Sequence, residues 1–319
     1  MNAAPSVLFV PCCTKRVAAT RVRIYQYLPF IEKRGLSYRI FPIVSDATTR
    51  RMLASPTFKG PGKLLYYLQV LVEKLFRFVG VLFLAGRYDV VFFQRTSFPF
   101  GLEKLIKKVN PNIIFDFDDS IFMADPDSKE LGWLGRLKDR LKASEVSGMV
   151  SASKLVVAGN DFLKEYADRF SRNAIVSTET IDTVRYTVGP RKTSGPVCIG
   201  WIGSPSTSAY LEMLLPVWRV LVKQYDLRIR LIGAGDYRRE GLEIVNVPWD
   251  FETEIGELHK FDIGVMPQPT SQWTEGKFGS KMLQYMAVGV PAVISNSRAN
   301  AEVMEDGVNG FLARTEEDW

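Results

Sequence analysis

The chain has 319 residues, which is enough for two domains, and its 46% apolar and 24% charged residues are ordinary for a globular protein. It contains no apolar run long enough for a transmembrane helix, no secretory signal and no cysteines at metal-ligand spacing, so we expect a cytoplasmic protein. Its single histidine, His259, argues against a histidine-dependent hydrolase and a histidine-rich metal site.

Charge is unevenly distributed. Residues 1–192 carry 30 Lys and Arg against 18 Asp and Glu, a surplus of 12 positive charges, whereas residues 193–319 carry 11 against 17. A basic half indicates an anionic partner, either nucleic acid or an anionic membrane surface. Because no zinc-finger, RRM or basic-region signature is present, we favour the membrane and expect no nucleic acid. The alternative is a set of solvated charges without a partner.

Short apolar runs alternate with helical patterns along the first half. A helix is expected over 22–34, kinked at Pro29, and strands are expected at 7–10, 38–43, 90–93, 113–115 and 155–158. Apolar strands without polar alternation are typical of a parallel sheet covered on both faces. The order strand, helix, strand predicts an α/β domain with right-handed crossovers.

Residues 64–85 form a very apolar helical pattern with Glu73, Lys74 and Arg77 at its middle. Our preferred interpretation is a buried helix with one polar edge. The alternative is a helix that lies partly in a membrane interface, because it belongs to the basic half.

Gly, Pro and small polar residues follow Tyr186, and we interpret them as a linker. The predicted domains are 1–188 and 197–319, joined by 189–196. A second α/β pattern then begins, with a helix at 210–225 and strands at 197–202, 228–232, 242–247, 262–266 and 292–295. Two such domains predict a ligand cleft at the carboxyl ends of their strands. Thr315 and the acidic residues after it are typical of a helix start, so we expect the sequence to be truncated.

The most informative segment is 276–295, in which a turn with Lys277 and Lys281 opens a short helix that leads to an apolar strand. Unpaired N–H groups and the helix dipole beside two lysines suit a phosphate or diphosphate. The loop 203–207, between a strand and a helix, is a second candidate. The alternative for 276–281 is a plain structural loop with solvated lysines, and the alternative for 203–207 is a helix N-cap. Neither a Walker loop nor a complete dinucleotide fingerprint is present.

Segments 199–211, 261–269, 276–295 and 302–319 resemble the family-4 retaining glycosyltransferases of the GT-B fold, in that family's order and spacing. Segments 16–35, 88–95, 113–122 and 156–167 resemble one bacterial branch of it. The resemblance implies two Rossmann-like doubly wound domains that face each other across a cleft. It also implies C-terminal helices beyond Trp319.

The resemblance further implies that a nucleotide-sugar donor binds the second domain and that its sugar is transferred with retention of configuration. Gln284 stands where many members have a glutamate that holds the ribose, and Gly276 stands at the position of another usual glutamate. The basic pair usual after the first strand of this domain is also missing, and we expect two lysines to compensate for it. The implied donor-binding residues are Gly203, Ser204, Lys277, Phe278, Gly279, Lys281 and Gln284.

In such a transfer the leaving diphosphate gains charge, which fixed amides, a helix N-terminus and lysines can stabilise without a metal or other cofactor. The resemblance also implies that the departing phosphate helps to deprotonate the acceptor on the same face. On the acceptor side, we assign Asp118 and Asp119 to positioning the acceptor, and Arg21, Arg95 and Asp116 to contacting it. The alternatives are helix capping and salt bridges for the aspartates, and surface charge for the arginines.

We therefore predict a bacterial, metal-independent hexosyltransferase that uses a UDP-sugar rather than a GDP-sugar. The expected acceptor is a saccharide or lipid-linked saccharide of cell-envelope polysaccharide or glycoconjugate synthesis, reached at the inner face of the cell membrane. A nucleotide-sugar epimerase and a non-catalytic sugar-nucleotide-binding protein are the alternatives.

Overall fold

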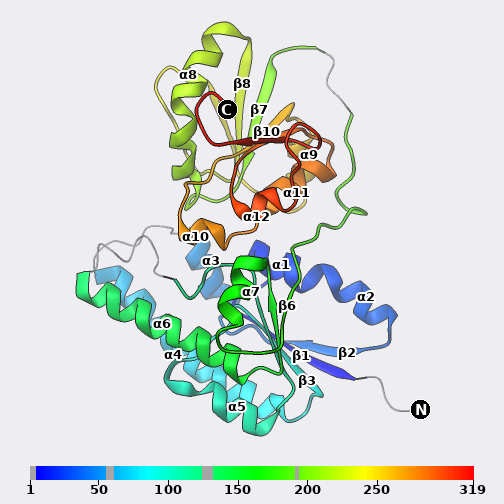
Figure 1. Cartoon of the computed structure of the whole chain (residues 1–319), viewed down its shortest axis with the longest axis vertical. Helices are drawn as coiled ribbons and strands as arrows, with labels where there is room; N and C mark the ends of the chain where they lie inside the picture. Colours follow the sequence, from blue (N-terminus) through cyan, green and yellow to red (C-terminus); the bar gives the residue numbers. More distant parts are fainter. Residues whose placement is uncertain (1–4, 55–60, 124–131, 191–193) are drawn as a thin grey trace. The chain divides into compact units, whose positions relative to one another are not determined.

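The computed structural model describes residues 5–54, 61–123, 132–190 and 194–319. The chain divides into two compact units. One runs to Glu179 and includes Gly276–Phe278, and the other comprises Thr180–Glu275 and Gly279–Trp319. Within the described residues each unit holds one six-stranded sheet of parallel strands covered by helices (Figure 1). The predicted α/β class with two Rossmann-like sheets is confirmed.

In the first unit the strand order is β2-β1-β3-β4-β5-β6. The strands are β1 (Ser6–Pro11), β2 (Ser37–Ile40), β3 (Val90–Gln94), β4 (Ile113–Phe117), β5 (Leu155–Ala158) and β6 (Ala174–Val176). The connecting helices are α1 (Ala18–Arg23), α2 (Leu28–Lys33), α3 (Asp46–Ala54), α4 (Pro61–Ala85), α5 (Glu103–Val109), α6 (Gly132–Ala152) and α7 (Asp161–Ala167). Short 3-10 turns occupy Tyr25–Tyr27 and Pro99–Gly101.

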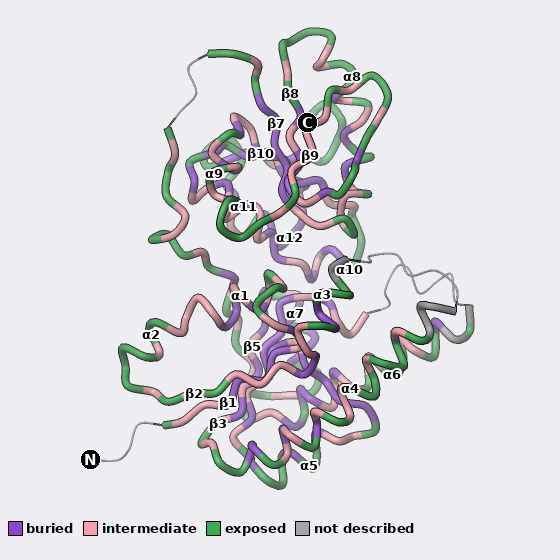
Figure 2. The backbone as a smooth tube through the Cα atoms, turned by 180° about the vertical axis from the view of Figure 1, so that it is seen from behind, coloured by how far each residue is buried: buried purple, intermediate pink, exposed green. Residues whose placement is uncertain are grey.

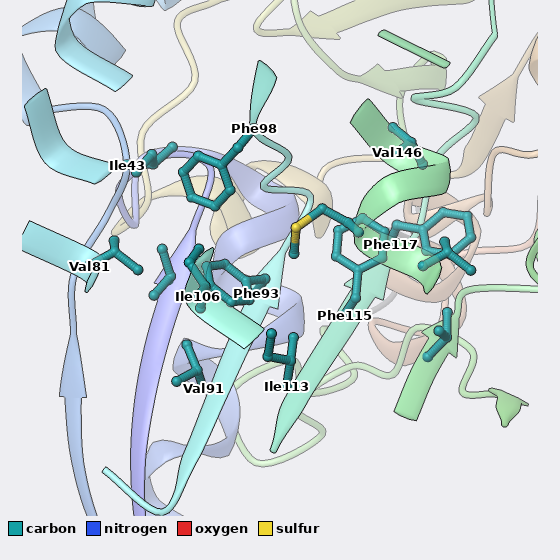
Figure 3. Close-up of a cluster of buried hydrophobic side chains, with 14 of the residues drawn as sticks. Ile43, Val81, Val91, Phe93, Phe98, Ile106, Ile113, Phe115, Phe117 and Val146 are labelled. Atoms are coloured by element: carbon teal, nitrogen blue, oxygen red, sulfur yellow. The ribbon is translucent and has the colours of Figure 1, made fainter. Parts of the chain in front are cut away.

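The core of this unit forms where apolar strands meet apolar helix faces. Phe93 and Phe115, from the two central strands, are fully buried and lie near Val81 of α4, Ile106 of α5 and Val146 of α6 (Figure 3). The edge strand β2 alternates exposed and intermediate residues, whereas inner strands such as β3, β4 and β7 are largely buried (Figure 2). Burial on both faces explains the apolar runs of these inner strands.

The helix expected over 22–34 is instead three pieces: α1, the turn Tyr25–Tyr27 and α2. Ile24 leaves the helical region with φ −131° and ψ −61°, which ends α1. Pro29 lies in the first turn of α2 rather than at a kink. Proline is tolerated there because the N–H groups of a first turn have no intrahelical partner.

The preferred interpretation of residues 64–85 as a buried helix is wrong. Phe78, Val81 and Leu84 of α4 are buried, but Phe76 is 81% exposed and Phe83 is 66% exposed. The sheet can cover only one face of a helix, so the apolar residues on the opposite face lie on the surface. Nevertheless, no helix in the described part of the chain is long and apolar enough to cross a membrane.

In the second unit the strand order is β12-β11-β10-β7-β8-β9. The strands are β7 (Val197–Ile202), β8 (Leu227–Ile232), β9 (Ile244–Val247), β10 (Ile263–Met266), β11 (Ala292–Ser295) and β12 (Phe311–Ala313). The helices are α8 (Leu215–Gln224), α9 (Glu254–Leu258), α10 (Gln272–Glu275), α11 (Ser280–Ala287) and α12 (Arg298–Ala301), and a 3-10 helix at Ser208–Leu214 forms the first part of the predicted helix 210–225.

One end of the second unit differs from the expectation, and the other carries the expected capping pattern. Residues 180–188, predicted to close the first domain, group with the second unit, because Arg185 and Tyr186 bond to Glu254. At the other end, Thr315 Oγ1 accepts from the Asp318 N–H at 3.4 Å and Asp318 Oδ2 accepts from the Thr315 N–H at 2.9 Å. This is the reciprocal pattern of a capping box.

Candidate functional site

The strand order locates the candidate ligand site of the second unit. The chain runs from β7 to β8 and β9 on one side and then returns to place β10 on the other side of β7. In doubly wound sheets, ligands bind outside the carboxyl ends of the strands at such a reversal. The loop that begins at Gly203 leaves β7 at this point.

Lys281 lies at this end of β7. Its Nζ is 4.5 Å from the centre of the buried Trp201 ring, a cation–π distance. A Cβ at Gly203 would be 3.1 Å from the same Nζ and 2.3 Å from the Trp201 ring, so only glycine fits there. Within the second unit, the structure thus brings Lys281 to the 203–207 loop, two features that the sequence analysis selected separately for phosphate binding.

The start of α11 lies against the carboxyl end of β10. A Cβ at Gly279 would be 2.6 Å from Asn300 Oδ1 and 2.7 Å from Met266 Cε, so the backbone passes too closely for any side chain. The helix has no side-chain cap bond and no acidic residue in its first turn, whereas Ser297 caps α12. Such an N-terminus carries a partial positive charge that suits an anion.

The hydroxyls of the β7 loop are engaged within the loop. Ser204 Oγ lies 2.9 Å from Ser206 Oγ, and the Thr207 hydroxyl donates to the Ser204 carbonyl at 3.1 Å. These bonds hold the loop in a compact turn. They also agree with the alternative interpretation of this segment as the cap of the following helix.

Gln284 projects from α11 toward two residues that the sequence analysis missed. Its Nε2 donates to Tyr186 Oη at 3.2 Å, and the Tyr186 hydroxyl donates to Glu254 Oε1 at 2.5 Å. Glu254 is 1% exposed and also accepts from Trp249 Nε1 at 2.7 Å. Burial, and then the Glu254 charge, raise the pKa of Tyr186 to about 12, so the phenol stays a donor. Neither residue belongs to a motif that sequence spacing could have indicated.

Lys277 and Phe278 are grouped with the first unit, Phe278 as a buried ring and Lys277 as a half-buried side chain. The predicted roles of Lys277 at the donor diphosphate and of Phe278 in the turn beside the donor sugar stay predictions. Glu275, one residue before the position of the missing family glutamate, accepts from the Arg298 backbone N–H at 3.2 Å.

In the first unit, three aspartates at the carboxyl end of β4 pair with arginines. Asp116 forms an ion pair with Arg23, and the two side chains are 1% and 5% exposed. Burial raises the pKa of Asp116 to about 6, and Arg23 offsets only part of that effect. Arg23 Nη1 also donates to the Ser177 carbonyl at 2.7 Å. Asp116 therefore forms a structural salt bridge, which was the alternative to acceptor contact for this residue.

Arg95 holds the other two candidate aspartates. Its Nε pairs with Asp118, whose side chain is fully buried, and its Nη1 lies 3.4 Å from Asp119 Oδ2. Burial alone would raise the pKa of Asp118, but the charge and hydrogen bond of Arg95, together with a hydrogen bond to Glu179, outweigh it and hold the pKa below its usual range. Arg95 has φ of 50°, a conformation that non-glycine residues adopt at a cost. Arg21, by contrast, donates to the Lys15 and Arg16 carbonyls of the loop before α1.

A pocket of about 170 Å³ lies at the carboxyl ends of β1 and β3, the reversal point of the first sheet. Three cationic side chains, Lys74, Arg95 and Lys142, line it together with Cys12, Thr48 and Thr96. Burial, and then repulsion from Lys142, lower the pKa of Lys74 to about 8. The sequence analysis assigned Arg95 to contacting the acceptor but missed the two lysines, which come from α4 and α6.

Comparisons with known proteins agree with this architecture. Residues 196–319 match the family model described as "Glycosyl transferases group 1". Anabaena Alr3699/HepE, solved in complex with UDP and glucose, superposes with a TM-score of 0.64 at 14% identity over 98% of this chain and 87% of its own. A glycosyltransferase from Rickettsia africae ESF-5 gives 0.63 at 13% identity over 99% and 86%.

An alpha-glucosyltransferase in complex with UDP-glucose and DNA containing an abasic site gives a TM-score of 0.61 at 12% identity over 98% of this chain and 84% of its own. A search of curated proteins finds no match. At these identities the structural likeness establishes the fold. The predicted GT-B fold and the predicted resemblance to group 1 glycosyltransferases are confirmed.

Proposed function

We propose that the protein is a retaining glycosyltransferase that transfers a sugar from a UDP-sugar to a saccharide or lipid-linked acceptor. The convergence of the Gly203 loop, the α11 N-terminus and Lys281 at one reversal point carries this proposal. It lies inside the segment that matches the glycosyltransferase family. UDP is the proposed nucleotide because Alr3699/HepE and the alpha-glucosyltransferase were solved with UDP or UDP-glucose.

The proposed chemistry is electrostatic. As the bond between sugar and diphosphate breaks, negative charge grows on the leaving phosphate, and the α11 amides and the Lys281 ammonium stabilise it there. The departing phosphate accepts the proton of the acceptor hydroxyl on the same face, so the chain needs neither a protein nucleophile nor a metal. Lys277 is proposed as a second diphosphate contact.

The acceptor is proposed to bind the first unit, at the pocket lined by Lys74, Arg95 and Lys142. Three cations favour an acceptor that carries a phosphate, as a lipid-linked saccharide does. Asp119 and Arg21 are proposed to position the acceptor at the rim. Asp118 acts through Arg95, which it pairs with. Such an acceptor is presented at the inner face of a membrane, which is the proposed site of action.

The diphosphate assignment is tested with the variants Lys281→Ala and Lys277→Ala. Each removes one cation, so the affinity for the UDP-sugar should fall about tenfold or more, since charged hydrogen bonds are the strong ones. Isothermal titration calorimetry measures the affinity, and Lys223→Ala, an exposed lysine of α8, is the control. Unchanged affinity in both variants would contradict the assignment.

Donor class and reaction are tested separately. A thermal-shift series with UDP-, GDP-, ADP- and dTDP-sugars should show the largest stabilisation with a UDP-sugar. Transfer to a lipid-linked acceptor should then proceed equally well with EDTA present. Turnover of the donor without an acceptor would indicate an epimerase, and binding without any turnover would indicate a non-catalytic binding protein.

A further inference from the structure

The outward face of α4 is apolar along its described length. Its exposed positions carry one polar side chain, Gln69, and otherwise Leu65, Tyr67, Leu68, Leu71, Val72, Phe76, Val79 and Phe83. A helix on the surface of a globular unit normally presents charged and polar residues to water. A contiguous apolar surface of this kind marks an interaction site.

The spacing of these residues makes a continuous stripe. Leu65, Leu68, Val72, Phe76 and Val79 follow one another at intervals of three or four residues, which places them on one side of the helix. The opposite side is fixed in the core and lines the pocket, with Val81 fully buried and Tyr66, Val70 and Lys74 at the pocket wall. The apolar stripe is therefore held outward by a well-packed helix.

A second helix with a basic surface lies beside α4. Lys138 Nζ of α6 is 4.7 Å from the centre of the Tyr67 ring, and Glu145 lies 4.0 Å from Lys74. The described exposed residues in the first half of α6 combine apolar with cationic side chains: Trp133, Arg136, Leu137, Arg140 and Leu141; farther along, the exposed residues are Ser144 and Ser151. At the far end of α4, Arg87 stacks 3.8 Å over the ring of Phe83.

We propose that this α4–α6 face, defined by the exposed residues of the two helices, docks on an anionic lipid bilayer with α4 lying in the interface. An apolar stripe with aromatic rings and flanking cations is the pattern of an interfacial helix. Charge favours lipid over a second copy, because two copies would bring two basic surfaces together, whereas anionic headgroups complement them. The first half of the chain carries the surplus of 12 positive charges.

The α4–α6 face is the surface for the membrane contact proposed above. Its role in acceptor access rests on the proposed function, whereas the docking itself does not. Because α4 carries the apolar stripe on one side and lines the cationic pocket on the other, a docked α4 brings that pocket next to the lipid. A lipid-linked acceptor could then reach the pocket without leaving the membrane.

The test is a vesicle flotation assay with the whole chain. Vesicles of phosphatidylcholine alone are compared with vesicles that contain about one third phosphatidylglycerol. The wild type should bind the anionic vesicles more tightly, and Phe76→Glu and Phe83→Glu should each lower partitioning by about tenfold. Phe30→Glu is the matched control, since Phe30 is also a helical phenylalanine of the first unit, 64% exposed, on α2. Circular dichroism confirms that each variant is folded.

Three results would overturn the proposal: no binding of the wild type to anionic vesicles, equal loss in all three variants, or unchanged binding of both α4 variants. Sedimentation analysis shows whether the face pairs two copies of the chain instead. If the wild type is a dimer, and Phe76→Glu dissociates it without changing vesicle binding, the result contradicts docking on lipid. UDP-sugar affinity is measured on the same samples. A wild type that binds vesicles but no UDP-sugar would contradict the proposed function and leave the docking surface supported.

Discussion

Arg23 and Asp116 show how a residue chosen for chemistry can be used for structure. Aspartates at the end of a strand are candidates for acceptor contact, and the sequence analysis selected Asp116 on that basis. The structure buries Asp116 beside Arg23, which reaches it from α1, 93 positions away in the sequence. No local pattern specifies such a partner.

The variant Asp116→Asn should lower the free energy of unfolding by about 3 kcal/mol, because it removes the carboxylate that is paired directly with the buried Arg23 charge. The double variant Arg23→Met with Asp116→Leu should lose less than the sum of the two single changes. Urea denaturation measures both. The control is Asp236→Asn, whose partner Arg238 is 82% exposed, and it should change stability little. Equal effects at both pairs would contradict this account.

Lys74 gives a pH-dependent prediction. Its pKa is about 8 in the folded chain and about 10.4 when unfolded, so between these values the unfolded chain binds more protons and stability from this group rises with pH. Lys74→Met should therefore be more stable than the wild type at about pH 7, with the difference shrinking toward about pH 10. Urea denaturation across this range measures it, with Lys223→Met as control. A difference that is independent of pH would show that packing, not charge, is the cause.

At the scale of elements, α11 carries the donor-site prediction. Its Gln284 stands in place of a glutamate, so its grip on a ribose is not charge-assisted. If Gln284 holds the ribose, Gln284→Ala should weaken UDP binding about threefold to tenfold but leave 2′,3′-dideoxy-UDP binding unchanged. Calorimetry with both nucleotides decides this. Tyr186→Phe, which removes the hydrogen-bond partner of Gln284 in this structure, is the companion variant. An equal loss with both nucleotides would assign Gln284 to structure alone.

Other elements show where local patterns were sufficient. The apolar strands were predicted at or close to their observed positions, because burial on both faces leaves an unbroken run of apolar residues. The three-residue strands β6 and β12 were missed, since so short a run has no distinctive pattern. Pro29 was interpreted as a kink, but it lies in the first turn of α2, where it helps to start a helix.

For the whole molecule, the donor assignment predicts a pattern of hydrogen exchange. Saturating UDP should slow exchange of the amides at 203–207 and 279–282, because both segments lie at the reversal point of the second sheet. The amides of β1 and β4 in the first unit should exchange as before. Mass spectrometry of peptic fragments measures both sets. Protection confined to other segments would move the nucleotide away from the proposed site.

The sequence by itself determined the two α/β units, the glycosyltransferase resemblance and the two candidate phosphate segments, because these depend on residues that are close together along the chain. Only the tertiary structure decided which side chains meet: Lys281 with Gly203, Gln284 with Tyr186 and Glu254, and Lys74 with Arg95 and Lys142 at one pocket. It also decided that α4 turns half of its apolar residues outward. Periodicity records which residues share a face of a helix, but the sheet and the neighbouring helices determine whether that face is covered.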